Sequence, residues 1–164
     1  MAEIYAFLKL EGVDGETPDA HYEKHLELQS FSWGATNNSS YGTGTGPGIG
    51  TGQVHNMSFS KYMCVGSPKL MERVIKGWPC STGKLILCKR NSQDGKPLEY
   101  YTCEMENVVI TSYQMSASGG GQLPMESFSI DFVIVKPNYL AQKDDGSGKD
   151  NVGFGWDLQK NKEA

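Results

Sequence analysis

The sequence predicts a mainly β protein with one helix and one long glycine-rich loop. Three observations support that fold class. Apolar and polar residues alternate with a period of two along most of the chain, as in strands with one buried face. Only one segment has helical spacing, and one long stretch is too rich in glycine for either element. With 164 residues and 18.0 kDa, the chain is predicted to form one domain over residues 1–164.

The clearest predicted strand is Ser127–Val135, in which Phe128, Ile130, Phe132 and Ile134 share one face and polar residues share the other. Turn residues at 91–95 predict a hairpin loop. The same alternation predicts further strands over Leu26–Trp33, Gln53–Met63, Leu85–Arg90, Leu98–Met105, Asn107–Met115 and Val152–Leu158.

The first strand, predicted over Ile4–Leu10, is apolar on both faces. Tyr5 and Phe7 lie opposite the alternating aliphatic side chains. A strand that is covered on both sides, or that lies at a subunit contact, has this pattern. Tyr5 and Phe7 are therefore candidate subunit-interface residues.

The one predicted helix covers residues 67–77. Ser67 is the expected N-cap, Pro68 suits the first helical position, and Gly77 suits the left-handed residue that ends a helix. Helical spacing places four apolar side chains on one face, which we expect to pack on the core: Leu70, Met71, Val74 and Ile75.

Residues 34–52 form the predicted glycine-rich extended loop, since seven of these nineteen residues are glycine. Only Tyr41 and Ile49 offer much apolar surface there. A loop this long without structure of its own is usually functional or disordered, so a contact in an assembly that orders it is one hypothesis and a freely mobile surface loop is the other. A second flexible stretch is expected over residues 143–150.

Charge and hydropathy exclude several classes of protein. Fifteen basic and nineteen acidic side chains give a net charge of −4 without any basic cluster, which disfavours nucleic-acid binding. The longest apolar run, Ile4–Leu8, is far shorter than the ~20 residues of a membrane span, so no membrane insertion is expected. No signal peptide is predicted, and the four cysteines are expected to be reduced.

The motifs that suggest enzyme chemistry are each incomplete. His21, Glu23 and His25 have the wrong spacing for a zinc protease helix. The zinc deaminase pattern that His21 and Cys80 begin lacks its second cysteine, because that position is Gly83. Residues 77–84 contain one residue too many for a phosphate-binding loop and follow a helix instead of a strand. We therefore expect no catalytic residues, no cofactor and no metal.

Three short landmarks carry a resemblance to a known family: Phe31-Ser-Trp-Gly34 before the glycine-rich loop, Phe59-Ser-Lys61 followed by Ser67-Pro68-x-Leu70, and Gly155-Trp-Asp157 followed by Asn161. In this order and spacing, from about Ala2 to Ala164, the sequence resembles the haemolysin-coregulated protein (Hcp) family. This family forms the inner tube of bacterial type VI secretion systems. Cys64 departs from the pattern, because family members often have an acidic residue there.

The resemblance implies an antiparallel β-barrel with one flanking helix, six copies of which close head-to-tail into a ring. The rings would stack into a tube, surrounded by a contractile sheath and tipped by a spike trimer, with small effector proteins in the lumen. The protein would move from the bacterial cytoplasm to the outside or into a target cell when the sheath contracts. Because the resemblance ends with the chain, a plain tube subunit without a fused enzyme is expected.

The resemblance also implies roles for individual residues. Ser32 is the candidate lumen and effector contact, with Phe31 and Trp33 on the packed side of its strand. The candidate ring-stacking residues in the glycine-rich loop are Tyr41, Gly46, Pro47 and Ile49. The alternative function is a ligand-binding, lectin-like β-sandwich, in which Trp33, Trp78 and Trp156 would contact sugars.

Overall fold

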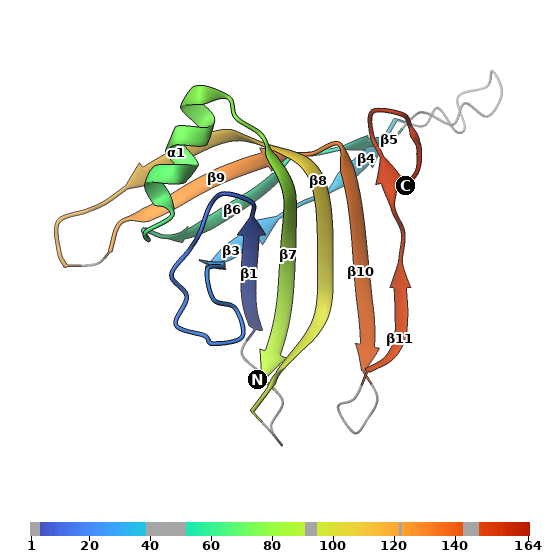
Figure 1. Cartoon of the computed structure of the whole chain (residues 1–164), viewed down its shortest axis with the longest axis horizontal. Helices are drawn as coiled ribbons and strands as arrows, with labels where there is room; N and C mark the ends of the chain where they lie inside the picture. Colours follow the sequence, from blue (N-terminus) through green and yellow to red (C-terminus); the bar gives the residue numbers. More distant parts are fainter. Residues whose placement is uncertain (1–3, 39–51, 91–94, 122, 143–147) are drawn as a thin grey trace.

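The computed structural model describes residues 4–38, 52–90, 95–121, 123–142 and 148–164. Strands β1, β7, β8 and β10 run side by side, and β3, β6 and β9 cross them at one end (Figure 1). The strands are β1 (Ile4–Leu10), β2 (Leu26–Leu28), β3 (Ser30–Ser32), β4 (Ala35–Asn37), β5 (Gly52–Val54), β6 (Met57–Tyr62), β7 (Cys80–Arg90), β8 (Pro97–Ser116), β9 (Met125–Asp131), β10 (Ile134–Gln142), β11 (Gly148–Gly153), β12 (Trp156–Asp157) and β13 (Lys162–Glu163).

Antiparallel pairing runs around most of a barrel wall. One sheet has the order β10-β8-β7-β1-β2, and β3-β6-β9-β8 continues the wall. β2 pairs with β1 and β3 pairs with β6, and the continuous chain at Gln29 connects β2 and β3 at the ends of the wall. The predicted mainly β fold with antiparallel pairing and one flanking helix is confirmed.

β8 belongs to both sheets. Its first half pairs with β7 and β10, and its second half, from Val109 to Ser116, pairs with β9. Asn107, at the junction, has a positive φ of 55°, a conformation that asparagine tolerates better than most residues. The prediction of two strands separated at residue 106 was wrong, because the chain turns the corner at Asn107 without leaving the ladder.

Other predicted boundaries also differ. The segment predicted as one strand over Leu26–Trp33 divides at Gln29, because its two halves pair with different partners. The segment Ser127–Val135 divides after Asp131, whose carboxylate accepts a hydrogen bond from the Phe132 amide. β7 begins at Cys80, five residues earlier than predicted. These strand ends are set by tertiary pairing, and the alternation of apolar and polar residues does not show where they lie.

The main core fills the space between the two sheets. It includes Leu8, Met57, Phe59, Met105 and Phe128, each at most 3% exposed. The four cysteines are unpaired, as expected, and three of them are buried. In the described part of the chain, no helix has the length and apolar character that crossing a membrane would take.

The helix α1 (Ser67–Lys76) packs against β8 at the end of the barrel (Figure 1). Gly77 ends it in the left-handed conformation, as predicted, with φ of 64°. The predicted Ser67 cap was wrong: Gly66 is the N-cap, and the Ser67 hydroxyl instead accepts a hydrogen bond from the Cys64 amide. Of the predicted apolar stripe, Leu70 is buried, but Met71 is 37% exposed and Ile75 is 76% exposed.

The two segments predicted to be flexible contain strands at their ends. Ala35–Asn37 (β4) pairs with Gly52–Val54 (β5), so the predicted loop over residues 34–52 begins and ends as a two-stranded ribbon. In the second segment, Gly148–Asp150 lies in β11 and pairs with the end of β10.

Candidate functional site

The tripeptide Ser-Phe-Ser occurs three times, at 30–32 on β3, 58–60 on β6 and 127–129 on β9. The three copies lie side by side and in register. Ser32 is opposite Ser58 and Ser30 is opposite Ser60 across β3 and β6. On the other side of β6, Ser58 lies opposite Ser129 and Ser60 lies opposite Ser127 of β9. Two rows of serines therefore cross three strands.

Both rows continue onto β8, where Ser112 lies opposite Ser129 and Gln114 lies opposite Ser127. We call this surface the serine face. Its side chains are exposed or half-buried. It consists of Ser30, Ser32, Ser58, Ser60, Thr111, Ser112, Gln114, Ser127 and Ser129.

The phenylalanines of the three tripeptides fix the orientation of the serine face. Phe31, Phe59 and Phe128 are register partners on the opposite side of the sheet. Phe59 and Phe128 are buried, with their ring centroids 5.2 Å apart. Because successive side chains of a strand point to opposite faces, burial of these rings turns the flanking serines outward.

A β-bulge adds one hydroxyl to the serine face. The register between β8 and β9 shifts between Ile110 and Ser112, so Thr111 and Ser112 both face Ser129. The Ser129 hydroxyl lies 2.7 Å from the Thr111 hydroxyl and 2.6 Å from that of Ser112. Each hydroxyl has one proton and two acceptor positions, so the surface keeps acceptors for further polar groups. The serine face is thus neutral and polar, and all its side chains except Gln114 are serine or threonine.

Ser32, the predicted lumen residue, lies on this face and is exposed. Its neighbours in sequence point the other way. Phe31 is 38% exposed, because β3 lies at the edge of the sheet. Trp33 is half-buried: its ring contacts Phe132 edge-on, and its Nε1 donates a hydrogen bond to the His55 carbonyl oxygen.

Phe7 and Tyr5, the two predicted interface residues, differ in their surroundings. Phe7 is 2% exposed and stacks on Tyr22 of the same chain, with ring centroids 4.3 Å apart. Tyr22 thus covers the second apolar face of β1 at Phe7, and Phe7 is not available to a neighbouring subunit. Tyr5 is half-buried, with the Arg90 guanidinium over its ring. An interface role for Tyr5 stays a prediction.

The candidate stacking residues Tyr41, Gly46, Pro47 and Ile49 lie outside the described residues. The described residues on either side of this segment are paired, with Asn37 of β4 opposite Gly52 of β5.

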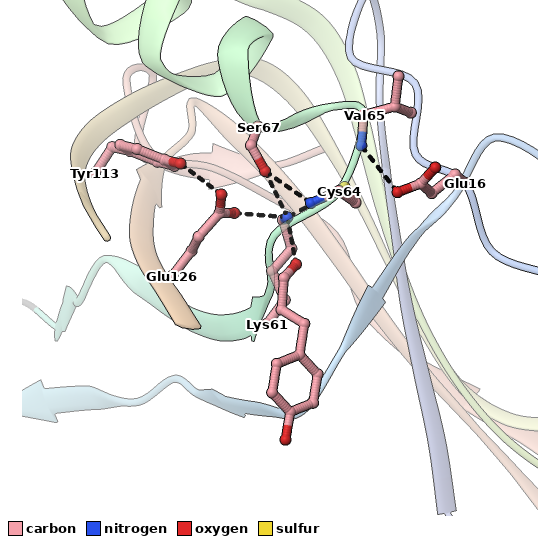
Figure 2. Close-up of polar contacts among 8 residues, drawn as sticks. Glu16, Lys61, Cys64, Val65, Ser67, Tyr113 and Glu126 are labelled. Carbon is pink, nitrogen blue, oxygen red and sulfur yellow. Dashed lines mark hydrogen bonds and ion pairs between the residues drawn. The ribbon is translucent and has the colours of Figure 1, made fainter. Parts of the chain in front are cut away.

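A buried polar cluster lies beneath the start of α1. Lys61 Nζ is 2.6 Å from Glu126 Oε2, and both side chains are almost inaccessible, at 1% and 0% exposed. Figure 2 shows the other partners around the same ammonium, which donates hydrogen bonds to the Tyr62 carbonyl oxygen, Cys64 Sγ and Ser67 Oγ. The cluster therefore ties β6 and β9 to the loop that leads into α1.

Tyr113 completes the cluster from β8. Its hydroxyl donates a hydrogen bond of 2.6 Å to Glu126 Oε1. Burial, together with this bond to a carboxylate, raises the pKa of Tyr113 above its ordinary value. This cluster was not predicted from the sequence. The signal was present, because Lys61 and Glu126 stand at inward positions of two alternating strands, where an apolar residue is expected.

The histidines singled out in the sequence have separate partners. The His21 ring contacts the Asp19 carboxylate, and the His25 ring contacts the Glu23 carbonyl oxygen. Among the described residues, no three side chains of metal-ligand type are grouped together.

Comparison with known proteins identifies the family. The family model described as "Type VI secretion system effector, Hcp" matches residues 7–139. The chain is also 30% identical over 160 residues to Protein hcp1 of Pseudomonas aeruginosa strain PAO1, which covers 96% of this chain and 97% of that protein. This chain belongs to the Hcp family.

Solved structures agree with this assignment. A structure described as that of a type six secretion system protein is 29% identical, with a TM-score of 0.89 over 99% of this chain and 100% of the other. Hcp1 from Salmonella typhimurium is 25% identical, with a TM-score of 0.77 over the whole of both chains. As an Hcp protein, the chain is a type VI secretion tube protein, and the lectin-like alternative is set aside. Consistent with this, Trp33 and Trp156 pack against the core.

Proposed function

We propose that six copies of this chain close head-to-tail into a ring and that the serine face lines the lumen. The observation that carries the proposal is the register of the three Ser-Phe-Ser tripeptides in a chain of the Hcp family. A lumen wall built from short hydroxyl side chains offers hydrogen bonds and leaves space for cargo. Such a surface suits transient contact with a folded effector better than an apolar or a strongly charged one.

The edges of the sheet that bears the serine face suggest how the ring closes. In the described part of the chain, β3 pairs only with β6, and the second half of β8 pairs only with β9. Edge strands present unpaired backbone groups, which can extend a sheet into a neighbouring molecule. We propose that β3 of one copy lies beside the second half of β8 of the next. Such a heterologous contact generates a ring when its rotation closes.

Membership of the Hcp family supports a proposal for the remaining partners. We propose that rings stack through the segment between β4 and β5, which includes Tyr41, Gly46, Pro47 and Ile49. The tube would be surrounded by the type VI sheath and tipped by the spike trimer, and it would carry small effector proteins out of the cytoplasm. The role is structural: a scaffold and carrier, with no catalytic step and no cofactor.

Electron microscopy of the purified protein tests the ring directly. We expect closed rings of uniform diameter, and native mass spectrometry should give six copies per particle. A stable monomer across micromolar concentrations would contradict the ring. Placement of the serine face is tested separately, by introducing a cysteine at Ser58 and labelling it with maleimides of increasing size. A lumenal position is supported if larger maleimides label this cysteine less than smaller ones in the assembled ring, but equally well in the dissociated protein. Equal labelling by all sizes contradicts it.

A further inference from the structure

Lys61 and Cys64 bring an amine and a thiol together beside an open pocket. Lys61 Nζ lies 3.2 Å from Cys64 Sγ. Cys64 is half-buried and lines a pocket of about 290 Å³, together with Tyr62, Met63 and Leu123. The lysine lies behind it and is 1% exposed. A small solute in the pocket therefore reaches the sulfur before it reaches the nitrogen.

We propose that Cys64 and Lys61 form an oxidation site, at which hydrogen peroxide converts this contact into a covalent bond between Sγ and Nζ. Lys61 lies near the end of β6, and Cys64 follows three residues later in the segment that joins β6 to α1. Lys61 Nζ and Cys64 Sγ are already in contact, and the carboxylate of Glu126 lies next to the amine (Figure 2). The site is independent of ring formation, since all its groups come from one chain.

The chemistry takes two steps. In the first, the Cys64 sulfur attacks one oxygen of hydrogen peroxide, the O–O bond breaks, and the products are a sulfenic acid and one water. Sulfur is oxidised by two electrons and peroxide is reduced. In the second, Lys61 passes its extra proton to Glu126 and its free amine attacks the sulfenic sulfur. The S–O bond breaks, and hydroxide leaves as a second water with a proton from the nitrogen. The product is a sulfenamide, as known from condensation of sulfenic acids with nitrogen nucleophiles.

The ion pair between Lys61 and Glu126 allows the amine to attack the sulfenic sulfur although the site is buried. An ammonium is not a nucleophile, so the lysine needs a base, and Glu126 Oε2 is 2.6 Å away. Proton transfer within the pair leaves two neutral groups, which costs less in a buried site than a separated charge. After the reaction, Glu126 carries the proton, and the nitrogen is neutral, so no unpaired charge remains in the cluster.

The other three cysteines lack these features. Burial raises the pKa of the Cys103 thiol to about 12 and raises those of Cys80 and Cys88 as well, which leaves little reactive thiolate. All three are buried, whereas Cys64 is half-buried. Oxidation is therefore expected to select Cys64.

Peptide mapping of the wild-type protein tests the proposal. The protein is treated with hydrogen peroxide at concentrations that leave its thermal unfolding midpoint unchanged, then digested with trypsin without reductant. We expect a peptide that contains both Lys61 and Cys64, uncleaved after Lys61, and lighter than the unmodified sequence by two hydrogen atoms, about 2 Da. Addition of a thiol reductant should restore the mass and the cleavage, because a thiol displaces the nitrogen from sulfur.

Two variants provide controls. Cys64→Ser removes the sulfur and should give normal cleavage after Lys61 under the same peroxide treatment. Lys61→Arg keeps the positive charge beside Glu126 but replaces the amine by a poor nucleophile, so Cys64 should then stop at sulfenic or higher acids. If Lys61→Arg does not fold, the wild-type digest still decides. Cleavage after Lys61 that is unaffected while Cys64 is oxidised, or a Cys64 that stays reduced while another cysteine reacts, overturns the proposal.

Discussion

Lys61 Nζ and Glu126 Oε2 lie 2.6 Å apart, with both side chains withdrawn from solvent, and they face each other across the neighbouring strands β6 and β9. Desolvation of two charges is expensive, and this pair is compensated by its neighbours: Tyr113 donates to the carboxylate, while Ser67 and Cys64 accept from the ammonium. The pair therefore fixes the position of the loop before α1 as well as the register of two strands.

Removing one member of this pair should destabilise the fold strongly. Lys61→Met leaves the Glu126 carboxylate buried without a cation, and we expect a loss of about 3–5 kcal/mol in the free energy of unfolding, measured by urea denaturation. The double variant Lys61→Met/Glu126→Gln keeps an acceptor for Tyr113 and should recover at least half of that loss. A control in an exposed pair, Lys76→Met, should change stability by at most about 0.5 kcal/mol. Equal effects of Lys61→Met and Lys76→Met would contradict the role of burial.

The carboxyl of Glu72 on α1 should titrate far below its ordinary range. Hydrogen bonds from Lys76 and then Lys69 lower its pKa from 4.5 to about 2. Because the folded pKa is below the unfolded one, the contribution of this group to stability is present above pH 4.5 and is lost as the pH falls toward about 2. Carboxyl chemical shifts followed by NMR against pH should show this midpoint. In Lys76→Met the midpoint should move upward, and an unchanged midpoint would contradict the assignment.

The sequence predicted the fold class and the end of the helix for physical reasons that are local. Alternation at Phe128 and Ile130 shows which face is buried, and Gly77 takes a left-handed conformation at little cost. Strand ends at Gln29 and the corner at Asn107 depend on which strand pairs with which, and no local pattern encodes that. The same limit applies to the prediction that Phe7 lies at an interface. Tyr22 covers the second apolar face of β1 at Phe7, and it comes from a loop whose path the sequence does not reveal.

Of the residues of the serine face, only Ser32 was predicted from the sequence. Ser32 came from the resemblance, whereas the Ser-Phe-Ser repeat on three strands was open to inspection in the sequence. Its meaning depends on register, because serines in three distant segments form rows only if the strands pair without a shift. The bulge at Thr111, which aims two hydroxyls at Ser129, is likewise a property of the paired strands.

Substitution at Ser32 should separate ring formation from cargo binding. Ser32→Gln places a larger side chain on the serine face without touching the packed side of β3, so native mass should still give rings. Retention of a lumenal effector in co-purification should fall roughly tenfold, which corresponds to about 1.4 kcal/mol of binding energy. Ser81→Gln, at an exposed serine of β7 away from this face, is the matched control. Loss of rings in Ser32→Gln, or equal retention in both variants, would place Ser32 elsewhere.

Shortening the segment between β4 and β5 should abolish stacking and leave ring closure intact. Asn37 and Gly52 are register partners, so a two-residue Asn-Gly turn in place of residues 38–51 fits the end of this ribbon. We expect soluble rings by native mass that no longer grow into tubes or support secretion. A shortened protein that is secreted normally would show that the segment is dispensable. One that falls apart into monomers would place the segment in the contact within a ring.

The continuity of β8 has a mechanical consequence for a type VI secretion tube protein. This 20-residue strand is hydrogen-bonded in the core sheet over its first half and carries part of the serine face over its second. If the serine face contacts cargo as proposed, a drag force on cargo at Ser112 is transmitted along the covalent backbone of β8 into the barrel. The two sheets cannot separate unless β8 leaves one of its two ladders. The corner at Asn107 is therefore spanned by covalent backbone, which links the surface that bears Ser112 to the ladder that β8 forms with β7.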